Sequence, residues 1–271
     1  MGVTCSFTMN FMILLLICLV VSAVGFYKYV YFISLGYGFS MAAEGLVMLL
    51  LYRKSLEMGT VLQCLLLLLY GCRLGTYLFL REKNSAAYQR TMKKEIKDGS
   101  HMKSAAKAGI WIACALLYAL MASPLYFRLE NGFGADGFNL VGMVIMAAGI
   151  AVESVADLQK SKAKELNPNR FCDSGLYRFV RCPNYFGEIL FWTGMFISSL
   201  NIYDGFWEWG AAILGYVSIV YIMFGGARRL EIRQNRNYGS DPAYQKYAKN
   251  TPILLPFVPL YSVEKYKWLV G

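Results

Sequence analysis

Long apolar runs dominate the chain, and short polar segments separate them. A run of about 20 mostly apolar residues is long enough to cross the hydrocarbon of a bilayer as a helix. Lipid offers no partner to a bare backbone amide, so such runs have to be helical. Seven segments qualify, at approximately 8–27, 30–52, 60–80, 108–127, 138–156, 185–203 and 206–224. The pattern predicts an all-α, polytopic membrane protein with a bundle of seven transmembrane helices.

Composition supports this prediction and excludes other classes of protein. Of the 271 residues, 57% are hydrophobic and 16% are charged. A soluble domain has about 45–50% apolar and about 25% charged residues. A soluble enzyme, a nucleic-acid-binding module and a disordered chain are therefore disfavoured. The net charge of +10 is attributed to the membrane flanks, and no nucleic-acid partner is expected.

Basic residues are concentrated in every second connection between the predicted spans. Segment 81–107 holds eight lysines and arginines, segment 157–184 holds six, and the sequence after 224 holds eight. Connections 128–137 and 204–205 hold one and none. Basic connections stay in the cytoplasm. Seven spans then place the N-terminus outside and the C-terminus in the cytoplasm.

Cysteine and histidine usage argues against a metal site. The chain has seven cysteines without paired spacing and a single histidine. We therefore expect neither a disulfide framework nor a bound metal.

Ionisable residues that fall inside the predicted spans include Glu44, Arg73, Glu153 and Glu188. Such residues are costly in a membrane and are functional candidates by default. A protonated carboxyl group and a tyrosine hydroxyl can both donate hydrogen bonds to a carbonyl oxygen that gains charge. Glu44 and Tyr70 would suit an electrophilic carbonyl substrate in this way. The alternative is that Glu44 and Arg73 neutralise each other between helices.

One motif is discounted. Gly132, Gly134 and Gly137 spell GxGxxG, the dinucleotide-binding pattern. No strand precedes them and no βαβ unit surrounds them, so we interpret this stretch as a turn.

The segment 153–188 carries most of the candidate chemistry. Of its six basic residues, Lys160, Lys164, Arg170, Arg178 and Arg181 could gather phosphate groups. They precede a helix whose N-terminal amides favour an anion, and a second basic group follows at 227–233. Both groups could instead bind anionic lipid headgroups. Lipid binding does not require the polar residues Asp157, Asn184 and Glu188.

These residues resemble a known family. Segment 175–188 (GLYRFVRCPNYFGE) is similar to the C-terminal signature of the steroid 5-alpha-reductase family, which includes bacterial membrane proteins of unknown function. The tail 229–256 resembles the ending of the more distant sterol C14-reductases. Segments 70–74 and 156–160 also fit, and the similarity covers most of the chain from about Glu44 onward.

The resemblance implies a seven-helix bundle that holds NADPH from the cytoplasmic side. Within a single membrane domain spanning 1–271, residues 1–107 would form the substrate side and 108–271 the cofactor-binding half. Glu153 stands where the family has an asparagine. The implied cofactor-binding residues are Asp157, Lys164, Arg170, Tyr177, Arg181, Asn184, Tyr185, Glu188, Arg228, Arg229 and Glu231.

The resemblance also implies a reaction. Glu44 and Tyr70 occupy the positions of the family's pair that polarises the substrate carbonyl. The expected activity is that of an oxidoreductase that uses NADPH to reduce the C=C bond of a lipophilic enone, such as a Δ4-3-oxosteroid, to the saturated ketone. Lys164, Arg170 or Arg228 would contact the 2′-phosphate of the cofactor.

Two alternatives remain open. A similar pattern occurs in isoprenylcysteine carboxyl methyltransferases, which bind S-adenosylmethionine, but Cys182 replaces their histidine. The second alternative is a lipid-binding or transport protein without enzymatic activity. In each case we expect a monomeric multi-pass protein of a bacterial inner membrane or the endoplasmic reticulum, with a lipophilic small molecule and membrane lipids as partners.

Overall fold

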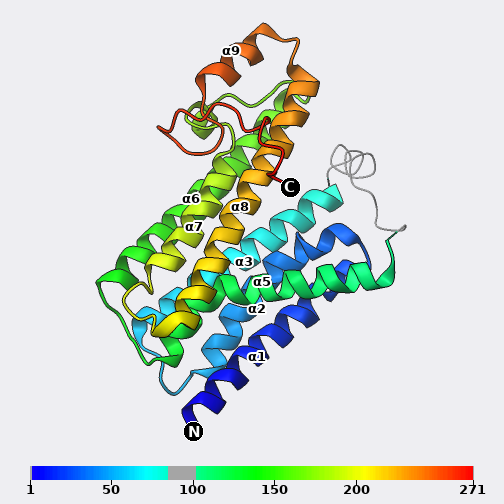
Figure 1. Cartoon of the computed structure of the whole chain (residues 1–271). Coiled ribbons are helices and arrows are strands. Elements are labelled where there is room, and N and C mark those ends of the chain that lie inside the picture. The colour runs from blue at the N-terminus through cyan, green and yellow to red at the C-terminus, as the bar shows by residue number, and fades with distance from the viewer. Residues whose placement is uncertain (1, 85–101, 271) are drawn as a thin grey trace. The chain divides into compact units, whose positions relative to one another are not determined.

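The computed structural model describes residues 2–84 and 102–270, and the regular elements in these ranges are helical, as predicted (Figure 1). Arg90, Lys93, Lys94 and Lys97 of the predicted basic loop lie outside the described residues. The α-helices are α1 Gly2–Ser22, α2 Leu35–Leu51, α3 Met58–Asn84, α5 Ser104–Glu130, α6 Gly137–Leu166, α7 Pro183–Ile197, α8 Gly205–Tyr238 and α9 Pro242–Asn250. Three 3₁₀ turns are η1 Ala23–Phe26, η2 Tyr29–Phe32 and η3 Gly175–Arg178.

Six helical stretches in the described part of the chain are long and apolar enough to cross a membrane. Large apolar side chains along them are more than half exposed, for example Leu16, Leu50, Val144 and Leu214. Side chains that face lipid have this exposure, because lipid tails are as apolar as the side chains. The chain is therefore built as a multi-pass membrane protein.

The seventh predicted span, 185–203, is not confirmed. It corresponds to α7, which has 15 residues and ends at Ile197. At about 1.5 Å per residue this helix is roughly 22 Å long, less than the ~30 Å of a bilayer core. The helix ends early because Ser198 and Ser199 enter a turn in which both are hydrogen-bonded and buried.

Two compact units divide the chain. Unit 1 comprises Met1–Met143 and Met195–Gly215, and unit 2 comprises Val144–Gly194 and Tyr216–Gly271. Helices α6, α7 and α8 each contribute residues to both units.

In unit 1, α2 and α3 pack against each other through small residues. A Cβ atom on Gly38 would lie 2.7 Å from the Gly75 nitrogen, and a Cβ atom on Gly71 would overlap the backbone of Ala42. Only glycine allows the two backbones to approach so closely. Because residue numbers rise along α2 as they fall along α3, the two helices are antiparallel.

Polar contacts mark the two ends of unit 1. At one end Lys28 pairs with Glu82, whose Oε1 also accepts a hydrogen bond of 2.8 Å from the Tyr31 hydroxyl. At the other end the Tyr52 hydroxyl donates to Glu130. The segment between α1 and α2 thus lies beside the end of α3, and the residue that follows α2 lies beside the end of α5.

In unit 2, α6 and α7 lie side by side (Figure 1). A Cβ atom on Gly149 would lie 2.6 Å from the Phe191 nitrogen, and one on Gly187 would lie 2.7 Å from the Glu153 nitrogen. This close crossing brings the polar face of α6 against the first turns of α7.

Candidate functional site

Glu44 and Tyr70, the predicted substrate-polarising pair, both lie in unit 1 and have no exposed surface. Ala42 and Gly71 meet where the antiparallel α2 and α3 cross. Glu44 comes two residues after Ala42, and Tyr70 comes one residue before Gly71. The backbones of Glu44 and Tyr70 therefore lie at the same level to within about one residue's rise of 1.5 Å.

The carboxyl group of Glu44 has unusual surroundings. Neither of its oxygens has a partner among the nitrogen and oxygen atoms of the described residues, and the same is true of the Ser40 hydroxyl one turn earlier. The thiol of Cys18, from α1, lies beside both side chains. A buried polar group without a partner costs about 1–3 kcal/mol. These atoms therefore form a polar spot in an apolar unit, suited to the polar end of a lipophilic ligand.

The alternative ion pair between Glu44 and Arg73 is not formed. The guanidinium of Arg73 lies over the ring of Tyr77, with 5.7 Å from Cζ to the ring centroid. This contact is favourable because the face of an aromatic ring is electron-rich.

The hydroxyl of Tyr70 is 2.8 Å from that of Tyr37, and either can be the donor. The ring of Tyr37 packs on Tyr118, whose hydroxyl donates to the Phe32 carbonyl at 2.5 Å. When Tyr37 donates, the Tyr70 proton is left for another acceptor. Sequence reasoning missed Tyr37, although its position seven residues before Glu44 places both on one face of α2.

In unit 2, four polar residues gather where α6 meets α7. Glu153, Asp157 and Glu188 are 3%, 5% and 6% exposed. The Oδ1 atom of Asn184, in the first turn of α7, is buried without a hydrogen-bond partner. Three of these residues are predicted cofactor ligands, and the contact between Gly187 and Glu153 brings their two helices together.

Two predicted cofactor-binding residues, Arg181 and Glu231, form an ion pair. The pair is 2.8 Å long and almost wholly buried. Arg181 also donates to the Tyr261 carbonyl, and Glu231 accepts from the Val263 amide at 2.8 Å. Next to Arg181, burial raises the pKa of the Cys182 thiol to about 12, so this thiol stays protonated at neutral pH.

Tyr177 and Tyr185 pack inside unit 2. The Tyr177 hydroxyl donates to the Ala156 carbonyl at 3.3 Å, and its own carbonyl accepts from the Tyr247 hydroxyl at 2.7 Å. The ring of Tyr185 lies close to Gly226 on α8.

The basic candidates fall into two groups. Lys164 donates to two carbonyls and to the Tyr238 hydroxyl, and Arg228 donates to the carbonyls of residues 264 and 269. Arg229 is exposed. Arg170 is 58% exposed and pairs with Asp173 at 2.8 Å, a contact that raises the pKa of Arg170. Of these four, Arg170 and Arg229 are exposed, whereas Lys164 and Arg228 are half-buried.

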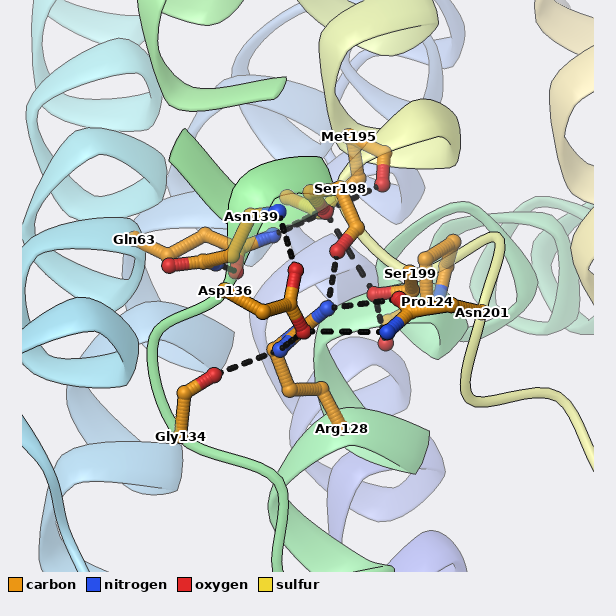
Figure 2. Close-up of polar contacts among 10 residues, drawn as sticks. All are labelled: Gln63, Pro124, Arg128, Gly134, Asp136, Asn139, Met195, Ser198, Ser199 and Asn201. Atoms are coloured by element: carbon orange, nitrogen blue, oxygen red, sulfur yellow. Dashed lines mark hydrogen bonds and ion pairs between the residues drawn. The ribbon is translucent and has the colours of Figure 1, made fainter. Parts of the chain in front are cut away.

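A second buried arginine, Arg128, is the centre of a hydrogen-bond network in unit 1 (Figure 2). It donates to the Gly134 carbonyl at 2.5 Å, to Asp136 at 2.8 Å and to the Ser198 carbonyl. Burial by itself raises the pKa of Asp136, but hydrogen bonds, the first from Arg128, outweigh it and hold this pKa below its ordinary value. Sequence reasoning missed this network, although an arginine alone between two apolar runs was its signal.

Polar side chains extend the network from Arg128. The Gln63 amide donates to Ser198 Oγ at 2.6 Å, and Asn139 donates to Gln63 at 2.7 Å. The predicted turn at the GxGxxG motif lies here, with Gly132 at φ +69°. The network supplies hydrogen-bond donors to backbone carbonyls that would have no partner in lipid.

Comparison with known proteins identifies a family. A family model described as "Protein of unknown function (DUF1295)" matches residues 18–251. No curated protein and no solved structure matches the chain. Because the family match covers well over half of the sequence, the chain belongs to the DUF1295 family.

Proposed function

We propose that this protein is a membrane-embedded reductase that uses NADPH to reduce the C=C bond of a lipophilic enone, such as a Δ4-3-oxosteroid, to the saturated ketone. The observation that carries the proposal is the carboxyl group of Glu44. It is wholly buried, no nitrogen or oxygen donor of the described residues bonds to either of its oxygens, the Cys18 thiol lies beside it, and its backbone is level with that of Tyr70.

The two side chains supply donors to one acceptor. In its protonated form Glu44 donates one hydrogen bond to the substrate carbonyl, and Tyr70 donates a second when Tyr37 donates to it. Hydride addition at the β carbon moves negative charge onto that carbonyl oxygen, and donors placed in advance stabilise it. A proton from water then completes the saturated product at the α carbon.

Unit 2 offers groups that fit a phosphorylated dinucleotide. The unpaired Oδ1 of Asn184 accepts hydrogen bonds, so it fits a carboxamide or a sugar hydroxyl. The guanidinium groups of Arg170 and Arg229 fit phosphate oxygens, because arginine binds them in bidentate geometry. When bound, NADPH supplies the hydride, and the chain supplies binding and orientation.

The surroundings of Cys182 support the reductase over the methyltransferase. In the methyltransferase pattern a histidine occupies this position, and a histidine can bind and exchange protons. Cys182 is fully buried, and its raised pKa keeps it protonated.

The test is a ligand titration of the purified protein in nanodiscs. We expect NADPH fluorescence to rise and saturate, and Asn184→Ala to weaken the affinity about tenfold, the effect of one lost hydrogen bond of ~1.4 kcal/mol. Asn167→Ala, which removes an exposed amide from the same unit, is the matched control.

Other outcomes separate the alternatives. Binding of S-adenosylmethionine in place of NADPH would identify a methyltransferase, and binding of neither would leave a passive lipid carrier. If NADPH binds, its oxidation is then followed in the presence of a panel of enones. Binding without enone-dependent oxidation contradicts the proposed reaction.

A further inference from the structure

Residues 263–270, which we name the strap, run back along α8. The Val263 amide donates to Glu231, and Arg228 donates to the Glu264 carbonyl at 3.0 Å. Further along, the Tyr221 hydroxyl donates to the Trp268 carbonyl at 2.6 Å. The partners on α8 thus descend from 231 to 228 to 221 as the strap ascends from 263 to 268, and the long side chain of Arg228 also reaches the Leu269 carbonyl at 3.4 Å. The two segments therefore run in opposite directions overall.

The contact with Tyr221 fixes the level at which the strap ends. Arg228 carries the first charge after the apolar run of α8, and this helix is a candidate membrane span. Tyr221 precedes Arg228 by seven residues, which is about 10 Å along the helix axis. The strap therefore reaches past the first charges of α8 and alongside its apolar part.

Strap side chains point in two directions. Val263 and Leu269 are 1% and 3% exposed and pack against unit 2. Trp268 and Val270 are 65% and 72% exposed, although they lie beside the apolar part of α8. The ring of Trp268 stacks on that of Tyr221, with centroids 6.1 Å apart. Tryptophan and tyrosine prefer the boundary between headgroups and acyl chains, where each ring keeps one polar and one apolar side.

The strap carries a net positive charge, with two lysines against one acidic residue, Glu264, which is also exposed. Lys265 and Lys267 are exposed. The only acidic side chain of the strap, Glu264, accepts a hydrogen bond of 2.6 Å from Asn235 on α8. Lysines next to a membrane helix attract anionic lipids, by about 1 kcal/mol each.

We propose that the strap is a lipid-binding anchor at the membrane interface. Trp268 and Val270 enter the boundary between headgroups and acyl chains, and Lys265 and Lys267 bind the phosphate groups of anionic phospholipids around α8. This inference does not depend on the proposed reductase activity, because it uses none of the groups assigned to that chemistry.

Brominated lipids test the depth of Trp268. Bromine quenches nearby tryptophan, and the difference between wild type and Trp268→Phe isolates Trp268 from the other four tryptophans. We expect several-fold stronger quenching of this difference signal by lipids brominated near the carbonyl end of the acyl chain than by lipids brominated near the methyl end. An unquenched signal places Trp268 in water or against protein and overturns the proposal.

A comparison of anionic and zwitterionic lipid headgroups tests whether Lys265 and Lys267 bind anionic phospholipids. In vesicles of unlabelled phosphatidylcholine with a small fraction of brominated lipid, brominated phosphatidylglycerol should quench Trp268 more than brominated phosphatidylcholine. The double variant Lys265→Ala, Lys267→Ala should abolish this preference. Lys246→Ala with Lys249→Ala, two exposed lysines on α9, should keep it. Equal quenching by both headgroups in the wild type refutes the anionic preference.

A measurement on the unaltered protein covers the case in which Trp268→Phe fails to fold. Trypsin cleaves after lysine, so bound lipid should protect Lys265 and Lys267 in anionic vesicles and expose them in detergent. Mass spectrometry of the released peptides reports both sites. Equal cleavage in the two media contradicts the anchor.

Discussion

Arg181 and Glu231 are fifty residues apart in the sequence and form an ion pair of 2.8 Å that is almost fully buried in unit 2. Each also binds the backbone of the segment that follows α9, Arg181 through the Tyr261 carbonyl and Glu231 through the Val263 amide. The pair thus fastens three parts of the chain at one point.

Removal of one partner should be costly. Glu231→Gln leaves the Arg181 guanidinium buried without a counter-charge, and breaking a buried pair in this way costs about 3–5 kcal/mol. We expect a clearly lower unfolding temperature in detergent. The control is Asp173→Asn, which breaks the exposed pair with Arg170 and should cost about 1 kcal/mol or less. Equal effects of the two substitutions would contradict this assignment.

The close crossing of α6 and α7 predicts that two glycine substitutions differ in their effect on stability. Gly187→Ala places a Cβ atom 2.7 Å from the Glu153 nitrogen and 2.8 Å from the Gly149 carbonyl, so the helices have to separate. We expect a loss of about 1–3 kcal/mol in stability, the usual effect of overpacking. Gly210→Ala, on α8, meets no atom within 4 Å and should be neutral or slightly stabilising. Thermal unfolding of the two variants, measured side by side, checks the prediction.

Asp136 should make the free energy of unfolding depend on pH. Its pKa is lowered in the folded protein, so the ionised carboxylate stabilises the fold above its ordinary pKa of about 3.9, and this contribution is lost as the pH falls through the lower folded value. Wild type should therefore exceed Asp136→Asn in stability at pH 7, and the difference should shrink between about pH 5 and pH 3. Asp204→Asn, which leaves the contacts of Arg128 intact, is the control. A constant difference across this range would refute the assignment.

Within the proposed reaction, Tyr70 and Tyr37 should differ in their effects. Tyr70→Phe removes a donor to the substrate carbonyl and should lower kcat about 10²–10³-fold, as loss of an oxyanion donor does. Tyr37→Phe keeps that donor and removes only its hydrogen-bond partner, so the loss should be smaller. Enone-dependent NADPH oxidation gives both values. Equal losses would indicate that the two hydroxyls act only through packing.

Much of the fold could be predicted because membrane spans follow from the length and polarity of single segments. The exception is 185–203, where hydropathy alone could not show that Ser198 and Ser199 would leave the helix for a buried turn. The end of a helix depends on partners from elsewhere in the chain, in this case Gln63 and the Pro124 carbonyl.

The candidate site could be predicted only in part. Burial of Glu44 and Tyr70 followed from their positions inside apolar runs, but the hydrogen bond between Tyr70 and Tyr37 depends on how two helices pack. Likewise, sequence pattern marks Arg181 as basic and functional, whereas its buried pairing with Glu231 needs contacts across fifty residues.

The small residues between α2 and α3 have a consequence for any ligand that reaches Glu44. Because Gly38 and Gly71 meet backbone atoms of the other helix, a slide of one turn would drive a bulkier residue into a main-chain atom. Such a slide would shift Glu44 relative to Tyr70 by about 5.4 Å. The close packing of the two backbones therefore fixes the axial register of α2 and α3, and with it the position of Glu44 relative to Tyr70.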